Sequence, residues 1–172
     1  GPAPQPLRLL GMRVDRTSYS EATRQIVRWA RAGESRYVCC ASVNNVIQAR
    51  DSARFGEIMN AADLVTPDGM PLVWGLRLLG AGPAVRVYGP DLTAAVLEAA
   101  AREGLPVGFY GANGDTLARL TANLLRRWPA LRIVYALAPP FRPLTAGEDA
   151  EVTRAIRASG ARILFVGLST PK

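Results

Sequence analysis

Apolar and polar positions along the chain follow two periods, one typical of helices and the other of short buried strands. Residues 18–33 repeat apolar side chains at helical spacing behind an S-x-x-E capping box, which predicts an amphipathic helix that a glycine ends. The run 36–42 is short, apolar and partly β-branched, and it predicts a buried strand ending at Ser42. Further elements are expected in the order of a helix at about 45–60, a short strand at 63–65, a helix at about 71–79, and a helix at 89–104 capped by Asp91.

The last third of the chain has the most regular pattern. Three short apolar runs alternate with two helical segments, which is the βαβαβ order of a parallel sheet. Because such sheets bind ligands at the carboxyl ends of their strands, residues that directly follow a strand are candidates for binding. The strands are expected at 106–111, 132–137 and 162–168, the helices at about 114–127 and 147–158, and a proline-rich loop at 138–148.

The amino-acid composition limits the kinds of catalysis and metal binding that the chain can support. The chain has 172 residues, 49% of them hydrophobic, which is enough to bury a core. It contains no histidine, so Ser-His-Asp and Cys-His catalysis are excluded and acid–base work falls to Asp, Glu, Tyr or Cys. The only cysteines, Cys39 and Cys40, are adjacent, so we expect neither an intrachain disulfide nor a zinc site, and a reducing cytoplasm fits best.

The formal net charge of +7 comes almost wholly from arginine. The arginine clusters are typical of a solvated surface, although contact with anionic lipid can add about 1 kcal/mol per basic residue. We expect no nucleic-acid partner, because helix-turn-helix and RNA-binding signatures are missing. No run approaches the ~18 apolar residues of a spanning helix, so a soluble or peripheral protein is expected. The clusters comprise Arg24, Arg28 and Arg31, and Arg126, Arg127 and Arg132.

One carboxylate stands out by its position. Asp68 lies between Pro67 and Gly69, where the strand predicted at 63–65 gives way to a helix. Asp-Gly is a favoured turn pair and Pro71 suits a first helical turn, so Asp68 can be a turn residue or a helix cap. A carboxylate at a strand end can instead serve as a general base, worth ~10²–10⁴-fold in rate. The residues alone leave both interpretations open.

A second candidate site follows the strand predicted at 106–111. Gly111 and Gly114 lie between this strand and a helix, where bare amides and a helix N-terminus can hold a phosphate. The spacing is neither G-x-G-x-x-G nor a Walker loop, and glycines at such a junction also serve tight turns. A plain turn and a nucleotide-phosphate site therefore remain alternatives.

Four segments, taken in order, resemble the TagA/WecG/CpsF family of bacterial glycosyltransferases over about residues 36–172. The most specific are the Pro-Asp-Gly that follows "ADLV" and the Arg-Val-x-Gly-x-Asp-Leu pattern after it. The resemblance implies transfer of N-acetylmannosamine, or a related sugar, from a UDP donor to polyprenyl-diphosphate-linked N-acetylglucosamine. The products would be precursors of teichoic acid, common antigen or capsule. The segments are 41–80, "RVYGPDL" at 86–92, "VGFYGANGD" at 107–115 and "VGLSTPK" at 166–172.

The resemblance also implies roles for individual residues. Asp68 matches the general base that deprotonates the acceptor hydroxyl, and Arg86 matches the arginine that steadies a substrate diphosphate. A direct base implies single-step displacement with inversion at the anomeric carbon. No metal or other cofactor is expected, since D-x-D is missing. The remaining expected site residues are Ser42, Asn44, Asn45 and Gly69 for the substrate, and Gly111, Asn113 and Gly114 for the nucleotide.

On this basis we expect an α/β protein in which a Rossmann-like parallel sheet in the C-terminal lobe packs on a smaller N-terminal α/β catalytic lobe. Residues 1–104 are expected to form the catalytic lobe and 105–172 the nucleotide-binding lobe, together as one compact unit. Family members continue past the Pro-Lys pair into a basic appendage that reaches the membrane, whereas this chain stops at Lys172. We therefore expect a cytoplasmic protein, peripheral on the inner face of the bacterial membrane through a missing appendage, with a monomer–homo-oligomer equilibrium left open.

Two rival functions remain at this stage. One is another nucleotide-dependent transferase or an oxidoreductase that uses the glycine loop, which binding of NAD rather than UDP-sugar would favour. The other is a non-catalytic nucleotide-binding module in which Asp68 only caps a helix.

Overall fold

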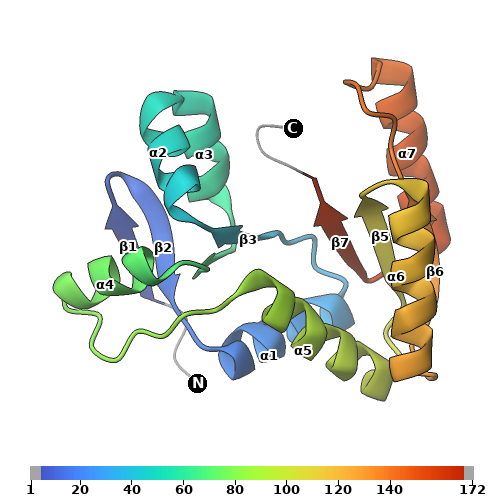
Figure 1. The fold of residues 1–172 in the computed structure, drawn as a ribbon, viewed down its shortest axis with the longest axis horizontal. Helices are drawn as coiled ribbons and strands as arrows, with labels where there is room; N and C mark the ends of the chain where they lie inside the picture. The colour runs from blue at the N-terminus through green and yellow to red at the C-terminus, as the bar shows by residue number, and fades with distance from the viewer. Residues whose placement is uncertain (1–4, 169–172) are drawn as a thin grey trace. The chain divides into compact units, whose positions relative to one another are not determined.

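The computed structural model describes residues 5–168, and Figure 1 labels its helices and all its strands except β4. The terminal Ser-Thr-Pro-Lys of the last family-like segment lies outside the described residues. The chain forms two compact units, the first comprising residues up to 29 and 34–95, and the second residues 30–33 and 96 onwards. The predicted α/β class, with a parallel sheet in the C-terminal part, is confirmed.

The first unit begins with an antiparallel hairpin of β1 (Gln5–Leu9) and β2 (Met12–Arg16), which the sequence analysis did not predict. Leu10 and Gly11 form the two-residue turn, with φ of 49° and 88°. Left-handed backbone at both turn positions matches the twist of paired strands, and glycine reaches it without steric cost.

The next elements mostly follow the predicted order. The two residues of the predicted capping box interact at the start of helix α1 (Tyr19–Ala32), where the Ser18 hydroxyl accepts from the Glu21 N–H and donates to the Glu21 carboxylate. The short strands β3 (Val38–Ala41) and β4 (Leu64–Pro67) pair in parallel, with Ala41 opposite Pro67.

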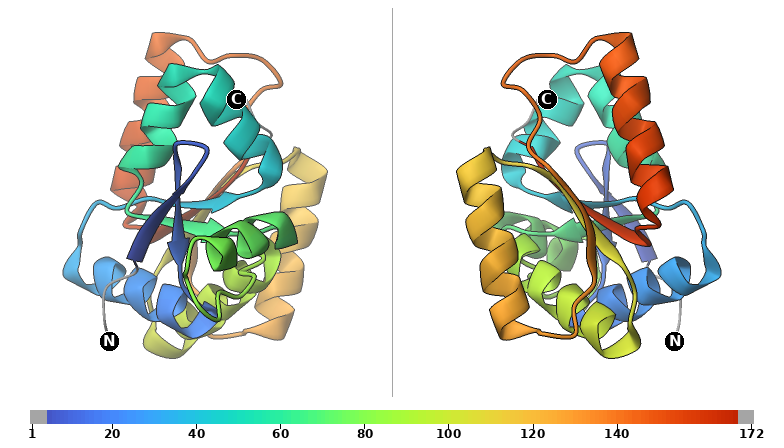
Figure 2. Two further views of the ribbon diagram at one scale, coloured as in Figure 1. Left: turned by 90° about the vertical axis from the view of Figure 1, so that its left-hand side faces the viewer. Right: turned by 90° about the vertical axis from the view of Figure 1, so that its right-hand side faces the viewer.

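The single helix predicted at about 45–60 is wrong, because the chain forms two helices there. Helix α2 (Val43–Asp51) and helix α3 (Ala53–Ala61) lie side by side, as Figures 1 and 2 show. Ser52 has extended backbone and its hydroxyl accepts from the Phe55 N–H, so it ends one helix and caps the next. Close approach of the two helices requires glycine at 56, where a Cβ would lie 2.9 Å from the Ala49 carbonyl oxygen.

Two helices complete the first unit and lead out of it. Helix α4 (Met70–Leu78) begins after Gly69, and helix α5 (Gly89–Glu103) runs from the first unit into the second. The prediction that Asp91 caps α5 is wrong, because Asp91 lies within the first turn of that helix. A Gly-Pro pair opens the helix instead, and Pro90 loses nothing there because first-turn amides have no intrahelical acceptor.

The second unit contains the predicted βαβαβ segment. Strands β5 (Val107–Gly111), β6 (Ile133–Leu137) and β7 (Ile163–Gly167) form a parallel sheet in the order β6-β5-β7. Helices α6 (Gly114–Arg127) and α7 (Ala146–Ser159) connect them and both contact β6. The rings of Phe109 and Phe165 stack across β5 and β7, with centroids 5.3 Å apart.

A buried carboxylate in β2 joins the N-terminal hairpin to β4. Asp15 is fully buried, and its carboxylate accepts from the Arg13 Nε at 2.8 Å and from the Val65 N–H at 2.7 Å. Around this pair lies the apolar core of the first unit, contributed by the hairpin, by β3 and β4 and by helices α2 to α4. Its members include Met12, Val14, Ala41, Val46, Met59, Val65, Leu72, Val73 and Leu76.

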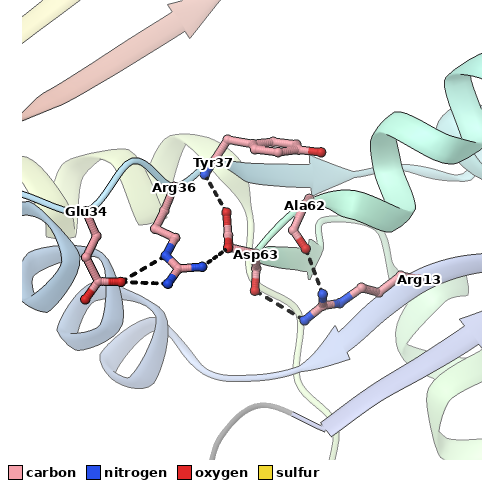
Figure 3. A network of polar contacts seen from close by, with 6 residues as sticks. All are labelled: Arg13, Glu34, Arg36, Tyr37, Ala62 and Asp63. Atoms are coloured by element: carbon pink, nitrogen blue, oxygen red, sulfur yellow. Dashed lines mark hydrogen bonds and ion pairs between the residues drawn. The ribbon is translucent and has the colours of Figure 1, made fainter.

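A polar network fixes the segment that enters β4 (Figure 3). The Asp63 carboxylate accepts from the Tyr37 N–H at 2.9 Å and from the Arg36 guanidinium at 2.8 Å. The Arg13 guanidinium donates to the carbonyl oxygens of Ala62 and Asp63. Desolvation of the Asp63 carboxyl acts in the opposite direction, but the bonds from Tyr37 and Arg36 outweigh it and lower the pKa of Asp63 below its ordinary value.

Substituting Gly111 should destabilise the second unit. Its φ is +135°, and a Cβ there would lie 2.3 Å from the Gly167 carbonyl oxygen in β7. We expect Gly111→Ala to lower the free energy of unfolding by about 3 kcal/mol in urea denaturation. The matched control is Gly114→Ala, since a Cβ at 114 meets nothing within 4 Å and should leave stability within about 0.5 kcal/mol of wild type. Equal stability of the two variants would contradict this account of the turn.

The lowered pKa of Asp63 predicts a pH-dependent contribution to stability. A carboxyl group whose pKa is lower in the folded state stabilises the protein above its unfolded pKa, about 3.9, and loses that contribution as pH falls through the folded pKa. We therefore expect Asp63→Asn to cost about 1 to 2 kcal/mol in the free energy of unfolding at pH 7. The difference in the free energy of unfolding between variant and wild type should persist down to about pH 5. It should then diminish progressively as the pH falls below about 4 and through the lower pKa of folded Asp63. A difference that stays constant to pH 3 would show that the charge of Asp63 is not what stabilises the fold.

Candidate functional site

The parallel pairing of β3 and β4 brings two predicted site residues together. Ala41 is the register partner of Pro67, and the Asp68 N–H donates to the Ala41 carbonyl oxygen at 2.9 Å. Ser42 and Asp68 therefore follow the carboxyl ends of adjacent strands, the position where parallel sheets place binding and catalytic groups.

The Asp68 carboxylate is held by residues from the segment before α5. Its Oδ2 accepts from the Gly89 N–H at 3.1 Å, and its Oδ1 lies 3.6 Å from the Arg86 Nη2. The Arg86 Nε also donates to the Asp68 backbone carbonyl. The side chain of Asp68 retains 23% of its accessible surface. One carboxylate oxygen is thus fixed by an amide, while the other faces a guanidinium at a distance longer than a hydrogen bond.

This arrangement bears on whether Asp68 caps a helix. The residue before α4 is Gly69, which has φ of −104° and no side chain to offer as a cap. The Asp68 side chain reaches instead to Gly89, the first residue of α5 and 21 positions away in the sequence. A carboxylate at a helix N-terminus is favoured by the helix dipole, so Asp68 stabilises the start of α5 rather than the helix that follows it.

The start of α5 is built to receive this carboxylate. A Cβ at position 89 would lie 3.2 Å from the Asp68 Oδ2 and 3.5 Å from the Cys40 Cβ, so a side chain there would require the carboxylate to shift from its observed place. The preceding amide, of Tyr88, donates to the Tyr19 hydroxyl oxygen at 2.9 Å. The same hydroxyl donates to the Asp91 carboxylate at 3.4 Å. The two amides at this helix start are therefore engaged by protein groups and do not form an anion site.

Arg86 is held beside Asp68 without being buried. Its guanidinium lies over the Tyr88 ring, 4.5 Å from the ring centroid, and its side chain keeps 44% of its accessible surface. A planar guanidinium that stacks on an aromatic face still has N–H groups free to fork onto a carboxylate or phosphate. The position of Arg86 is thus compatible with an anionic ligand next to Asp68.

The polar residues after β3 have different local roles. The Asn45 Oδ1 accepts from the Ser42 N–H at 2.8 Å and from the Ser42 hydroxyl at 2.9 Å, which closes the first turn of α2. Asn44 is exposed in the same turn. Ser42 and Asn45 therefore have a structural reason to be polar, whereas the helix start gives none for the side chain of Asn44.

The predicted nucleotide residues lie at the carboxyl end of β5, in the second unit. Gly111 is required there by its backbone and by the proximity of β7, as described above. Asn113 caps α6 by accepting the Thr116 N–H at 2.8 Å. The helix start presents the amides of Gly114 and Asp115, but the Asp115 carboxylate adds negative charge in the same turn. The geometry explains the turn fully and leaves a phosphate role for Gly114 as a prediction.

The arginine clusters noted in the sequence are exposed to solvent. Arg31 pairs with Glu103 at 2.7 Å, and the Arg127 guanidinium lies over the Trp128 ring. Among residues 5–168, no helix combines the length and apolar character needed to cross a bilayer. Over the same residues, Cys, Asp and Glu side chains nowhere gather in threes as a metal site requires.

Sequence reasoning missed Tyr19 and Gly89. Gly89 had a usable signal, since it directly precedes the Pro-Asp of a predicted helix start, where the backbone approaches other groups closely. Tyr19 had none, because its partner at Tyr88 is 69 residues away and sequence spacing does not reveal such a contact.

The comparison with known families agrees with this geometry and with the resemblance noted from the motifs. The model of the Glycosyl transferase WecG/TagA/CpsF family matches residues 7–172 of the chain. The match includes most of the N-terminal hairpin, both strands that lead to Ser42 and Asp68, and the whole βαβαβ segment. A family of this kind implies a sugar donor and an acceptor substrate. The chain therefore belongs to the WecG/TagA/CpsF family of glycosyltransferases.

Proposed function

We propose that the protein is an inverting, metal-independent glycosyltransferase. It moves N-acetylmannosamine, or a related sugar, from a UDP donor to polyprenyl-diphosphate-linked N-acetylglucosamine. The reaction serves cell-surface polysaccharide synthesis, of the teichoic acid, common antigen or capsule type, on the inner face of the cytoplasmic membrane. The observation that carries the proposal is the Asp68 carboxylate, held at the carboxyl ends of two parallel strands beside the Arg86 guanidinium.

Asp68 acts as the general base in this proposal. A sugar hydroxyl is too weakly acidic to attack unaided, so its proton must leave as the new bond forms. The proton passes to a carboxylate oxygen of Asp68, the acceptor oxygen bonds to the anomeric carbon, and the bond from that carbon to UDP breaks with its electron pair going to UDP. The bond from the Gly89 N–H fixes one oxygen, so the carboxylate keeps its orientation while the other oxygen takes the proton.

Arg86 stabilises the charge that develops on the leaving diphosphate. Its guanidinium is permanently charged, and its forked donors match phosphate oxygens. The long contact to Asp68 and the exposed side chain support this role, because the guanidinium can turn to a ligand without breaking a short ion pair. A cationic side chain in this place supplies charge stabilisation that many transferases obtain from a metal.

The other predicted residues have proposed binding roles within their own units. Ser42, Asn44 and Gly69 offer polar or bare backbone groups for sugar hydroxyls near Asp68, with Asn45 ordering Ser42. In the second unit, the turn at Gly111, Asn113 and Gly114 is proposed to hold part of the nucleotide at the carboxyl end of β5.

The direct test is acceptor-dependent release of UDP. The purified protein is offered UDP-N-acetylmannosamine, with UDP-N-acetylglucosamine and UDP-glucose as alternative donors, and a soluble lipid-diphosphate-N-acetylglucosamine analogue. Release that requires the acceptor and prefers the N-acetylmannosamine donor supports the proposal. Tight binding of NAD with no UDP release would favour an oxidoreductase instead.

Removing the charge of Asp68 should abolish most of the turnover. We expect Asp68→Asn to lower kcat by about 10²- to 10⁴-fold, because the amide cannot accept the proton. The matched control is Asp63→Asn, since Asp63 also accepts a backbone N–H and contacts an arginine but lies at the other end of β4. The control should lose stability and keep its kcat. An Asp68→Asn protein with wild-type kcat would return Asp68 to a purely structural role.

Arg86 should not be replaceable by lysine. We expect Arg86→Lys to lower kcat/KM by about tenfold or more, because a single ammonium cannot fork onto a diphosphate or stack on Tyr88 as a planar group does. Arg77→Lys is the control, since the Arg77 guanidinium donates to a backbone carbonyl oxygen, that of Ala84. Steady-state kinetics at varied donor concentration give kcat/KM for both variants. Equal effects in the two variants would argue against a diphosphate contact at Arg86.

A further inference from the structure

We propose that Tyr19 is a positioning residue, which aligns Asp68 and Arg86 through the segment that precedes α5. The inference rests on the proposed function of Asp68 as the base, and it adds a residue from α1 that the family-like motifs do not include. Tyr19 touches neither of the two reacting groups, so any effect on turnover must pass through the residues that it holds.

The contact begins with the phenol oxygen of Tyr19. This oxygen accepts from the Tyr88 N–H at 2.9 Å, while its own proton goes to the Asp91 carboxylate at 3.4 Å. Tyr19 is the first residue of α1, whose first turn is held by the bond from the Glu21 N–H to the Ser18 hydroxyl. The Tyr19 side chain therefore joins the start of α1, where its backbone lies, to the start of α5, where its hydroxyl is bonded. The aromatic ring between them is rigid.

The next amide along the chain is the one that holds the base. Tyr88 and Gly89 are consecutive, and the Gly89 N–H donates to the Asp68 Oδ2 at 3.1 Å. Pro90, which follows, has no N–H to offer. Two neighbouring peptide groups are thus fixed by two side chains, Tyr19 and Asp68. The peptide group of the Gly89 N–H is also held at its carbonyl end, because the Leu92 N–H donates to the Tyr88 carbonyl oxygen at 2.9 Å. If the Tyr88 N–H is released, the start of α5 can shift as a whole and carry the Gly89 amide away from the Asp68 carboxylate.

The same segment also sets the position of Arg86. The Tyr88 ring supports the guanidinium at 4.5 Å, and the Val87 N–H donates to the Pro67 carbonyl oxygen at 2.8 Å, so the chain from 86 to 89 runs along the end of β4. A shift of Tyr88 would therefore disturb the proposed base and the proposed diphosphate ligand together. The Tyr19 hydroxyl in α1 therefore influences the positions of Asp68 and Arg86 together.

The test compares two tyrosines whose hydroxyls each bond to backbone. Tyr19→Phe removes only the hydroxyl, and Tyr37→Phe is the matched control, since the Tyr37 hydroxyl donates to the Ile58 carbonyl oxygen at 2.6 Å in the same unit. We expect Tyr19→Phe to lower kcat by about tenfold with a smaller change in KM, while Tyr37→Phe keeps the wild-type kcat. Assays run where circular dichroism shows both variants folded.

Two further readouts separate positioning from general weakening of the fold. In an Asp68→Asn background, adding Tyr19→Phe should lower the residual rate by a smaller factor than it lowers the wild-type rate, because the part of its effect that acts through Asp68 is already lost. Independently of activity, hydrogen exchange at the Gly89 amide should accelerate about tenfold in Tyr19→Phe and not in Tyr37→Phe.

The outcomes distinguish failure of this inference from failure of the proposed function. If Asp68→Asn is inactive but Tyr19→Phe matches wild type in kcat and in Gly89 exchange, the positioning role is wrong and the base stands. The role is also wrong if the losses from Asp68→Asn and Tyr19→Phe multiply. If Asp68→Asn keeps full activity, the proposed function fails, and the exchange measurement alone then decides whether Tyr19 orders the start of α5.

Discussion

The structure of the first unit depends on one buried carboxylate, Asp15. It has no exposed surface, and its charge is offset by the Arg13 guanidinium and by the Val65 N–H. Removing one partner of such a pair costs about 3–5 kcal/mol, because it leaves an uncompensated buried charge. Since Val65 lies in β4, this bond sets where the strand runs, and β4 leads directly into Asp68. Through this bond to β4, the N-terminal hairpin helps to fix the position of the proposed base, Asp68.

The Asp68 carboxylate also has a structural contact, but unlike Asp15 it keeps exposed surface. A carboxylate that accepts an amide from a helix start is a structural element, and a carboxylate that keeps exposed surface beside an arginine is suited to chemistry. Asp68 meets both descriptions, because its two oxygens have different surroundings. The choice posed by the sequence, between a helix cap and a base, is therefore not exclusive. The structural bond to Gly89 gives the carboxylate the fixed orientation that general-base catalysis needs.

Local signals in the sequence predicted much of the fold. The capping box at Ser18, the glycine at 33 and the apolar runs of the βαβαβ segment act between near neighbours, so spacing alone reveals them. The break at Ser52 was missed because one extended residue between two helices barely disturbs the apolar period. The hairpin at 5–16 was missed because β2 packs on β4, a partner about 50 residues away that only the folded chain brings near. The sequence predicted the end of the β4 strand and singled out Asp68, but it predicted only one of the residues that hold or neighbour the Asp68 carboxylate. Arg86 came from the family-like motif, whereas Gly89 and Tyr19 act across separations of 21 and 69 residues.

The central claim is that the Asp68 carboxylate accepts the acceptor's proton, and rescue by an added carboxylate tests it most directly. Acceptor-dependent UDP release is measured in wild type and in Asp68→Ala, each with and without formate, whose small carboxylate can take the place of the missing side chain. If the Asp68 carboxylate is the base, Asp68→Ala is nearly inactive, formate restores part of its rate, and the wild-type rate does not change with formate. A rate in Asp68→Ala that equals the wild-type rate without formate would mean that another group takes the proton and would contradict the account.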